Sequence, residues 1–229
     1  MNAIVTAATK GMGRAIALRL SEAGYNLAIC ARNVDELMSF KDELQSSGVK
    51  VTAFKADFSV KEEVYGFCRH VAAYYPTIDV LVNNAGTFLT GEVLDESDDQ
   101  FETLLDLNLN SSYYCTKFFG KMMREQRSGH VFNICSVASK KIAENAGSYS
   151  VTKTAMFSLN NVFREELSKY NVKVTAVLPG STLTSSWEGT DIPAERFVQP
   201  EDVANTIFNV LQLSTGANVD EITITPVQF

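Results

Sequence analysis

A tyrosine and a lysine stand four residues apart in a stretch with a helical pattern. Tyr149 and Lys153 belong to the segment YSVTKTAMFSLNNVFREEL, and this spacing places both side chains on one face of a helix. A free phenol has a pKa of about 10 and is a poor base at neutral pH, but an ammonium group one turn away favours the phenolate. Such a tyrosine can protonate a carbonyl oxygen as hydride arrives, or deprotonate an alcohol in the reverse direction.

A serine 13 positions upstream of the tyrosine can complete this pair. Ser136 follows the apolar segment HVFNIC, which is typical of a strand. Strand ends on one edge of a parallel sheet line the ligand crevice, where a hydroxyl can hold a substrate oxygen that gains negative charge. A Tyr-x3-Lys pair by itself is most often surface packing. The serine, together with a glycine loop near the N-terminus, favours a catalytic site.

The glycine loop is the segment TAATKGMG at residues 6–13. It follows an apolar segment and precedes a helical pattern from Gly13 to Ala23. In this context Gly11 and Gly13 allow the backbone N–H groups and a helix N-terminus to approach a pyrophosphate. A Gly-x-Gly pair before a helix can also be a simple turn.

Two cations near this loop indicate which dinucleotide it would hold. An acidic residue about 20 residues past such a loop binds a ribose 2′-hydroxyl. Here the position holds Arg32, and Lys10 lies in the loop. Together they can bracket a 2′-phosphate, which favours NADP(H) over NAD, although both could be solvated surface cations. Asp35 and Glu36 are assigned to the first turn of the next helix.

The elements that must position these residues follow from an alternation of short apolar runs with longer helical patterns. Apolar strands separated by helices predict a mostly parallel sheet with helices on both faces. No linker composition interrupts the chain, so all 229 residues are read as one domain. The expected strands are NAIVTA at 2–7, NLAICA at 26–31, VKVTAFKA at 49–56, IDVLVN at 78–83, HVFNICS at 130–136, VKVTAVLP at 172–179 and EITITP at 221–226.

Several helix starts carry capping signals. Asn33, Ser59 and Ser97 each stand three residues before a Glu or Gln that can cap back. Pro200, followed by two acids, opens another predicted helix, because proline and acidic side chains suit the first turn.

Composition excludes several classes of function. The net charge of −7 argues against a nucleic-acid surface, which needs a basic face. No apolar run is long enough to span a bilayer, and the first residues lack the features of a secretory signal, so a cytoplasmic protein without membrane partners is expected. A metal site is not expected, because there are two histidines and the cysteines fit no zinc or redox spacing. Reduced, buried thiols are expected for Cys30, Cys68, Cys115 and Cys135.

The order of these motifs resembles the short-chain dehydrogenase/reductase family. The matching elements, which run from about residue 1 to 213, are Thr6 with Gly11-x-Gly13, Asp57-Phe58-Ser59, Asn83-Asn84-Ala85-Gly86, Asn108, Ser136, Tyr149-x3-Lys153 and Pro179-Gly180. The chain is most similar to bacterial sepiapterin-reductase-like and 3-oxoacyl-reductase-like members. The resemblance implies a single-domain, doubly wound Rossmann sheet of seven strands. It also implies hydride transfer between NADP(H) and a small ketone, aldehyde or alcohol.

The resemblance assigns further roles to individual residues. Lys153 would hydrogen-bond the nicotinamide ribose, and Asn108 would stabilise a helix kink and a water that relays protons to Lys153. Asn110 is a nearby competitor for that role. Asp57 would hold the adenine amino group. The complete set implied to contact the cofactor is Thr6, Lys10, Gly11, Met12, Gly13, Arg32, Asp57, Phe58, Asn84, Ala85, Gly86, Tyr149, Lys153, Pro179, Gly180, Thr182 and Thr184.

Some of these assignments have ordinary structural alternatives. Asn84 could be only a turn former, and Thr182 and Thr184 could be loop caps. Candidate substrate contacts are Phe88, Asn145 and Trp187, the last being the only tryptophan. An apolar wall from Trp187 would suit a ring or a short acyl chain, or it could be local packing of a small lid.

Two departures from the family pattern shape the functional prediction. Ala7 replaces the first glycine of the loop, and we expect a negative φ there, with only a modest change in NADPH affinity on Ala7→Gly. The C-terminal segment GANVDEITITPVQF lacks the Gly-Gly continuation usual in acyl-carrier-protein reductases, which favours a small carbonyl reductase. The alternatives are a 3-oxoacyl-thioester reductase and a non-catalytic NADP-binding regulatory module. A homodimer or homotetramer is expected through helices at 98–127 and 149–170.

Overall fold

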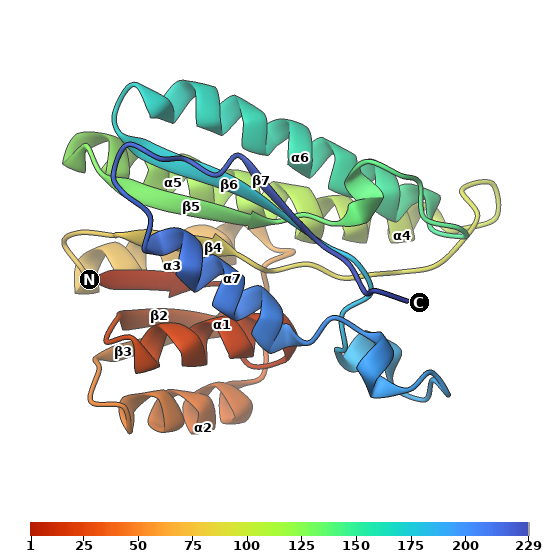
Figure 1. Ribbon diagram of the computed structural model, residues 1–229, viewed down its shortest axis with the longest axis horizontal. Coiled ribbons are helices and arrows are strands. Elements are labelled where there is room, and N and C mark those ends of the chain that lie inside the picture. The colour runs from red at the N-terminus through yellow and green to blue at the C-terminus, as the bar shows by residue number, and fades with distance from the viewer. Residues whose placement is uncertain (229) are drawn as a thin grey trace.

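The computed structural model describes residues 1–228 and contains a seven-stranded sheet (Figure 1). All neighbouring strands are parallel, in the order β3-β2-β1-β4-β5-β6-β7. The predicted parallel sheet and its seven strands are therefore confirmed, although the ends of five strands differ from the predicted ends by up to two residues. The strands are β1 (Asn2–Val5), β2 (Asn26–Ala31), β3 (Val51–Lys55), β4 (Val80–Asn83), β5 (Gly129–Ile134), β6 (Val172–Pro179) and β7 (Glu221–Ile224).

Helices cover both faces of this sheet, as the uninterrupted apolar strands predict. Side chains of β1 alternate between two cores: Val5 packs with α1, α2 and α7, whereas Ile4 packs with α3 and α5. The helices are α1 (Gly11–Glu22), α2 (Val34–Gln45), α3 (Lys61–Tyr74), α4 (Asp98–Leu105), α5 (Ser111–Gln126), α6 (Gly147–Ser168) and α7 (Pro200–Leu211). A π-helical turn (Asp106–Asn110) joins α4 to α5.

The capping predictions hold at some helix starts and fail at others. The side chain of Asn33 accepts hydrogen bonds from the first turn of α2, and α7 begins at Pro200, as expected. Ser59 does not cap α3, which follows Val60, because its hydroxyl donates to Asp57 Oδ1 at 2.7 Å. Ser97 precedes α4 but makes no side-chain cap. The cap predicted at Ser59 is therefore absent because its hydroxyl bonds the nearby Asp57 carboxylate.

The four cysteines are free and buried, as expected. Cys135 lies in a small core with Met156 and Leu178, and burial raises its pKa to about 12, so the thiol stays protonated at neutral pH. Within residues 1–228, no helix has the length and apolarity that a membrane span requires. No group of three or more His, Cys, Asp or Glu side chains in that range could hold a metal ion.

A buried histidine makes stability depend on pH. His130 stacks on Phe132, its Nε2 lies 2.8 Å from Thr175 Oγ1, and burial lowers its pKa to about 3. The unfolded chain takes up this proton near pH 6.5, whereas the folded chain does so near pH 3. The stability is therefore fully present above about pH 6.5 and is lost at up to roughly 1.4 kcal/mol per pH unit on acidification toward pH 3. Urea unfolding measured between pH 3 and pH 6.5 should show that the free energy of unfolding falls more steeply with acidification in wild type than in His130→Gln. An equal fall in the two proteins would contradict this role of His130.

Candidate active site

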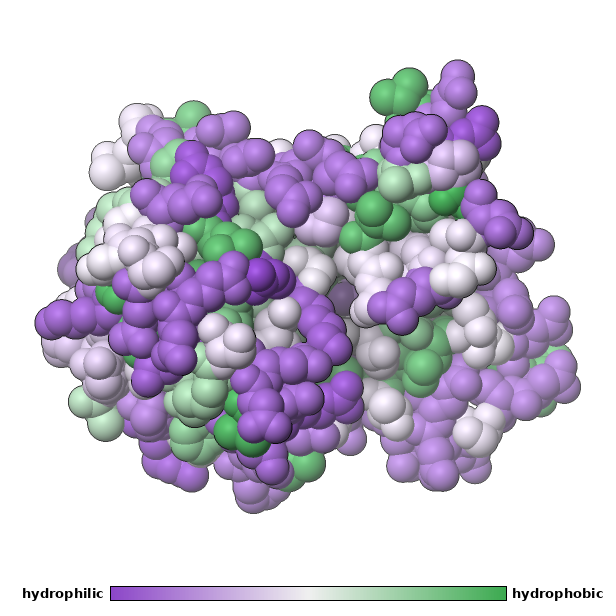
Figure 2. All heavy atoms as spheres, turned by 90° about the horizontal axis from the view of Figure 1, so that it is seen from below, coloured by the Kyte–Doolittle hydropathy of each residue, from purple (hydrophilic) through white to green (hydrophobic). Residues whose placement is uncertain are grey.

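The loops after β1 and β4 are joined at the carboxyl edge of the sheet, where the strand order reverses direction. Thr6 Oγ1 accepts hydrogen bonds from the backbone N–H groups of Asn84 and Ala85, both at 2.9 Å. Asn84 Nδ2 donates in return to the carbonyls of Thr6 and Ala7 at 3.0 and 3.1 Å. Asn84 is thus more than a turn former, since it fixes the glycine loop to β4. Figure 2, which views the molecule from below, shows a hollow near the middle of this face.

The N-terminus of α1 has features that favour binding of an anion. Lys10 is its N-cap residue but makes no side-chain cap, and the first turn holds no acid. In contrast, α2 has Asn33 as a cap and two acids in its first turn. The free N–H groups and the positive dipole end of α1 therefore fit the pyrophosphate of a dinucleotide.

The two glycines of the loop meet their surroundings closely. Gly11 has φ of +51°, and a Cβ placed there would lie 3.1 Å from Thr184 Cγ2. A Cβ on Gly13 would lie 2.4 Å from both the Ala7 carbonyl oxygen and Asn84 Nδ2. Thr184, from the loop after β6, therefore lies beside the glycine loop, and its contact with the phosphates stays a prediction.

The expectation of a negative φ at Ala7 is wrong. Ala7 has φ of +50°, in the left-handed region that favours glycine. The conformation is imposed by the surroundings: Ala8 N–H donates to the Cys30 carbonyl, and the Ala7 carbonyl accepts from Asn84 Nδ2. Tertiary hydrogen bonds thus outweigh a local strain of about 1–2 kcal/mol.

This strain predicts a stabilising substitution. Ala7→Gly should raise the free energy of unfolding by about 0.5–1 kcal/mol, because the released strain exceeds the added entropy of the unfolded glycine chain. Ala8→Gly is the matched control, since Ala8 is fully buried and has no positive φ; it should be destabilised. Denaturant unfolding checks both, and a destabilised Ala7→Gly protein would contradict the strain.

The two expected phosphate-binding cations come from different elements, since Arg32 follows β2 and Lys10 precedes α1. Arg32 is exposed. Lys10 Nζ lies 3.0 Å from Oε1 of Glu36, which stands in the first turn of α2 as expected. Burial raises the pKa of Asp57, but hydrogen bonds from Ser59 and the charge of Arg32 outweigh burial and leave this pKa lowered. Asp57 is therefore ionised at neutral pH and able to accept a bond from an adenine amino group.

Several other residues with proposed cofactor roles have side chains that are buried or partly buried in the protein. The Phe58 ring is buried against Phe67, so its side chain serves the core. Thr182 is buried and its Oγ1 donates to the Gly180 carbonyl at 3.0 Å, which is the geometry of a loop cap. Met12 is partly buried against the core. Pro179 ends β6, and a Cβ on Gly180 would touch Pro226 at 3.2 Å.

Lys153 is held by β5 and by the turn that follows Ser136. Its Nζ is buried and donates to the Ile134 carbonyl at 2.9 Å. Its own carbonyl accepts a bond from Ser139 Oγ at 2.8 Å. Ser136 Oγ accepts from Ala138 N–H at 3.1 Å, which fixes the hydroxyl at the start of a 3-10 turn. The structure thus connects the end of β5, with Ser136, to the first turns of α6.

Tyr149 lies in the first turn of α6, one turn before Lys153. Lys153 Nζ is 5.8 Å from the centre of the Tyr149 ring. Phe88, a candidate substrate contact from the loop after β4, packs edge-on against the same ring with centres 4.8 Å apart. The predicted serine, tyrosine and lysine are therefore carried by adjoining elements, and Phe88 lies beside the tyrosine.

Asn108, not Asn110, faces this site. It is buried in the π-helical turn between α4 and α5, and its side chain makes paired bonds with the backbone of Thr87 at 2.7 and 3.0 Å. A methyl group on Gly86 would lie 3.0 Å from Asn108 Oδ1 and 3.4 Å from Lys153 Nζ, so these side chains meet at Gly86. Asn110 instead bonds Asp106 at 2.8 Å.

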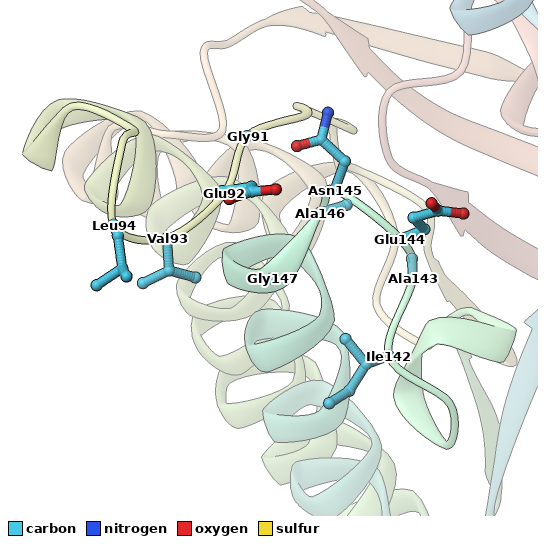
Figure 3. Close-up of a pocket in the computed structure, with 10 residues that line it drawn as sticks. All are labelled: Gly91, Glu92, Val93, Leu94, Ile142, Ala143, Glu144, Asn145, Ala146 and Gly147. Carbon is cyan, nitrogen blue, oxygen red and sulfur yellow. The ribbon is translucent and has the colours of Figure 1, made fainter.

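A hollow of about 400 Å³ lies between the loop after β4 and the loop before α6 (Figure 3). Asn145, a candidate substrate contact with φ of +49°, lines it and its carbonyl accepts from Gly91 N–H at 2.8 Å. Sequence reasoning missed the apolar lining residues Val93, Leu94 and Ile142. The available signal was an apolar Val-Leu pair in a polar loop without helical or strand periodicity.

Trp187 lies in a 3-10 turn (Ser185–Trp187) after β6. Its ring centre is 5.0 Å from that of Phe197, so the two rings pack within one segment. This arrangement matches local packing of a small lid, and the role of Trp187 as a substrate contact stays a prediction.

Comparisons with known proteins agree with this arrangement. Residues 1–192 match the family model described as short chain dehydrogenase. An uncharacterized oxidoreductase of Staphylococcus aureus is 32% identical over 228 residues, covering 98% of this chain and 96% of the relative. An alcohol dehydrogenase of the archaeon Thermococcus sibiricus, crystallised with 5-hydroxy-NADP, is 28% identical with a TM-score of 0.91, covering 99% and 96% of the two chains. Actinorhodin polyketide ketoreductase, crystallised with NADPH, is 26% identical with a TM-score of 0.89, covering 98% and 95%.

Proposed function

The chain belongs to the short-chain dehydrogenase family of oxidoreductases, and from this premise we propose that it is an NADPH-dependent reductase of small ketones or aldehydes. When bound, NADPH supplies the hydride. Neighbours crystallised with NADP-type cofactors support this proposal, as do the uncapped N-terminus of α1 and the cations Lys10 and Arg32. We place the reaction in the cytoplasm.

Each proposed catalytic residue has a task that its contacts allow. Tyr149 donates its phenolic proton to the substrate oxygen. Ser136 Oγ accepts from Ala138 N–H, so its own O–H can point toward that oxygen as negative charge develops. The ammonium of Lys153 favours the phenolate left on Tyr149 after transfer. Asn108 lies beside Lys153 at Gly86, where it can hold a water that relays a proton to Lys153 and so to Tyr149.

The observation that carries the proposal is the burial of Lys153 beside Tyr149 and Asn108. Burying an ammonium is unfavourable unless it is hydrogen-bonded, and here only 6% of the residue is exposed. The Ile134 carbonyl meets part of this need at 2.9 Å. A charge held in this way next to a phenol has a direct use in proton transfer.

A carbonyl panel tests the proposal. Purified protein should oxidise NADPH, and NADH more slowly, with at least one diketone, quinone or pterin carbonyl. Turnover confined to a 3-oxoacyl thioester would favour acyl reduction instead. Tight NADPH binding without turnover of any compound would favour a non-catalytic regulatory module. A clear preference for NADH would contradict the role given to Lys10 and Arg32.

We also propose a homodimer or homotetramer. An apolar groove of about 430 Å³ between α5 and α6 is lined by Leu109, Tyr113, Leu159 and Val162 among others. Val162 is 49% exposed, and covering it in a second copy would remove apolar surface from water. A monomer by light scattering would contradict this assembly.

A further inference from the structure

The ion pair between Lys10 and Glu36 lies at the edge of the proposed cofactor site. Lys10 Nζ is 3.0 Å from Glu36 Oε1, with 66% and 38% of the two side chains exposed. Lys10 is the N-cap residue of α1, and Glu36 is in the first turn of α2. Glu36 therefore holds its negative charge against one of the two cations assigned to a 2′-phosphate. The inference below rests on the proposed NADPH binding.

Helix α2 does not need this glutamate as a cap. The side chain of Asn33 already accepts from the N–H groups of Asp35 and Glu36, at 3.0 and 3.2 Å. Asp35 supplies a second acid for the positive end of the helix dipole. The carboxylate of Glu36 is thus directed across to α1, where its effect falls on Lys10.

A 2′-phosphate that contacts Lys10 must compete with this carboxylate. A phosphate monoester carries about −1.5 to −2 charges at neutral pH, so it is repelled by a carboxylate that shares the same ammonium partner. An exposed ion pair contributes little to holding a lysine in place, because water screens it and the long side chains lose freedom. The repulsion between the Glu36 carboxylate and the 2′-phosphate therefore has a larger effect on binding than any benefit from Glu36 holding Lys10 in place.

We propose that Glu36 is a specificity-determining residue that neutralises Lys10 and so weakens binding of the cofactor 2′-phosphate. Arg32 is left as the less restrained cation of the pair, although it also lies near the ionised Asp57. The preference for NADPH over NADH is consequently smaller than two cations alone would give, and it depends on ionic strength.

Calorimetric titration with 2′,5′-ADP and 5′-AMP tests this role, since the probes differ by the 2′-phosphate alone. Glu36→Gln should bind 2′,5′-ADP about two- to fivefold more tightly than wild type, with 5′-AMP unchanged. The gain should shrink in about 0.5 M salt, which screens exposed charges. Glu43→Gln is the matched control: it removes the 2.7 Å pair with Arg14 between the same two helices and should change neither affinity.

The outcomes separate this inference from the proposed function. Weaker or unchanged binding of 2′,5′-ADP by Glu36→Gln would overturn the role of Glu36, while the assignment of the site to NADPH would stand. Equal gains for both probes would also overturn it, because the effect would not belong to the 2′-phosphate. If wild type binds neither probe, the cofactor assignment and the role of Glu36 both fail.

Discussion

Tyr149→Phe should lose turnover by about 10²–10⁴-fold while NADPH binding is retained. The substitution removes the phenolic proton but keeps the ring that packs edge-on against Phe88. The buried Lys153 keeps its bond to the Ile134 carbonyl, so the fold around the site should not change. The measurement is the rate of NADPH oxidation with the best carbonyl of the panel, together with a cofactor titration.

The chain supplies a matched control for this experiment. Tyr113 and Lys117 have the same spacing on α5, and Lys117 Nζ lies 3.3 Å from the Tyr113 hydroxyl, but the pair is exposed. Tyr113→Phe should therefore leave turnover unchanged. A wild-type rate in Tyr149→Phe would show that the assigned acid is wrong, and loss of NADPH binding would show that the variant damages the site as a whole.

Gly13→Ala should weaken NADPH binding roughly tenfold or more, because it displaces the helix N-terminus that is proposed to face the pyrophosphate. The new Cβ would lie 2.4 Å from the Ala7 carbonyl oxygen and from Asn84 Nδ2. The first is backbone, so the start of α1 has to move away from the loops after β1 and β4. Overpacking of this kind also destabilises by about 1–3 kcal/mol.

Gly66→Ala is the comparison for this variant. Gly66 lies in α3, and a Cβ there would meet only the Phe54 ring, at an ordinary 3.5 Å. This substitution should leave NADPH binding unchanged and stabilise the protein by up to about 1 kcal/mol, because alanine is the better helix former. Denaturant unfolding and cofactor titration measure both variants. Equal behaviour of the two would refute the close packing of Gly13.

The sheet could be predicted from sequence because its determinants are local. Continuous apolar runs bounded by polar turns gave all seven strands, with β2 and β6 at their observed bounds. Single capping residues were less reliable, since Ser59 bonds the neighbouring Asp57 carboxylate in preference to the helix. Ala7 shows the same limit, because its positive φ is imposed by hydrogen bonds from residues distant in sequence.

The candidate site shows most clearly which features depend on sequence and which depend on tertiary structure. By itself the sequence determined the spacing that puts Tyr149 one turn from Lys153, and the order in which loop, serine and tyrosine follow one another. Tyr113 and Lys117 have that spacing too, and only the tertiary structure distinguishes the pairs: Lys153 is buried against β5 and Asn108, whereas Lys117 faces solvent. Helical spacing fixes which side chains share a face, but the burial that alters their chemistry depends on what non-local packing brings to that face.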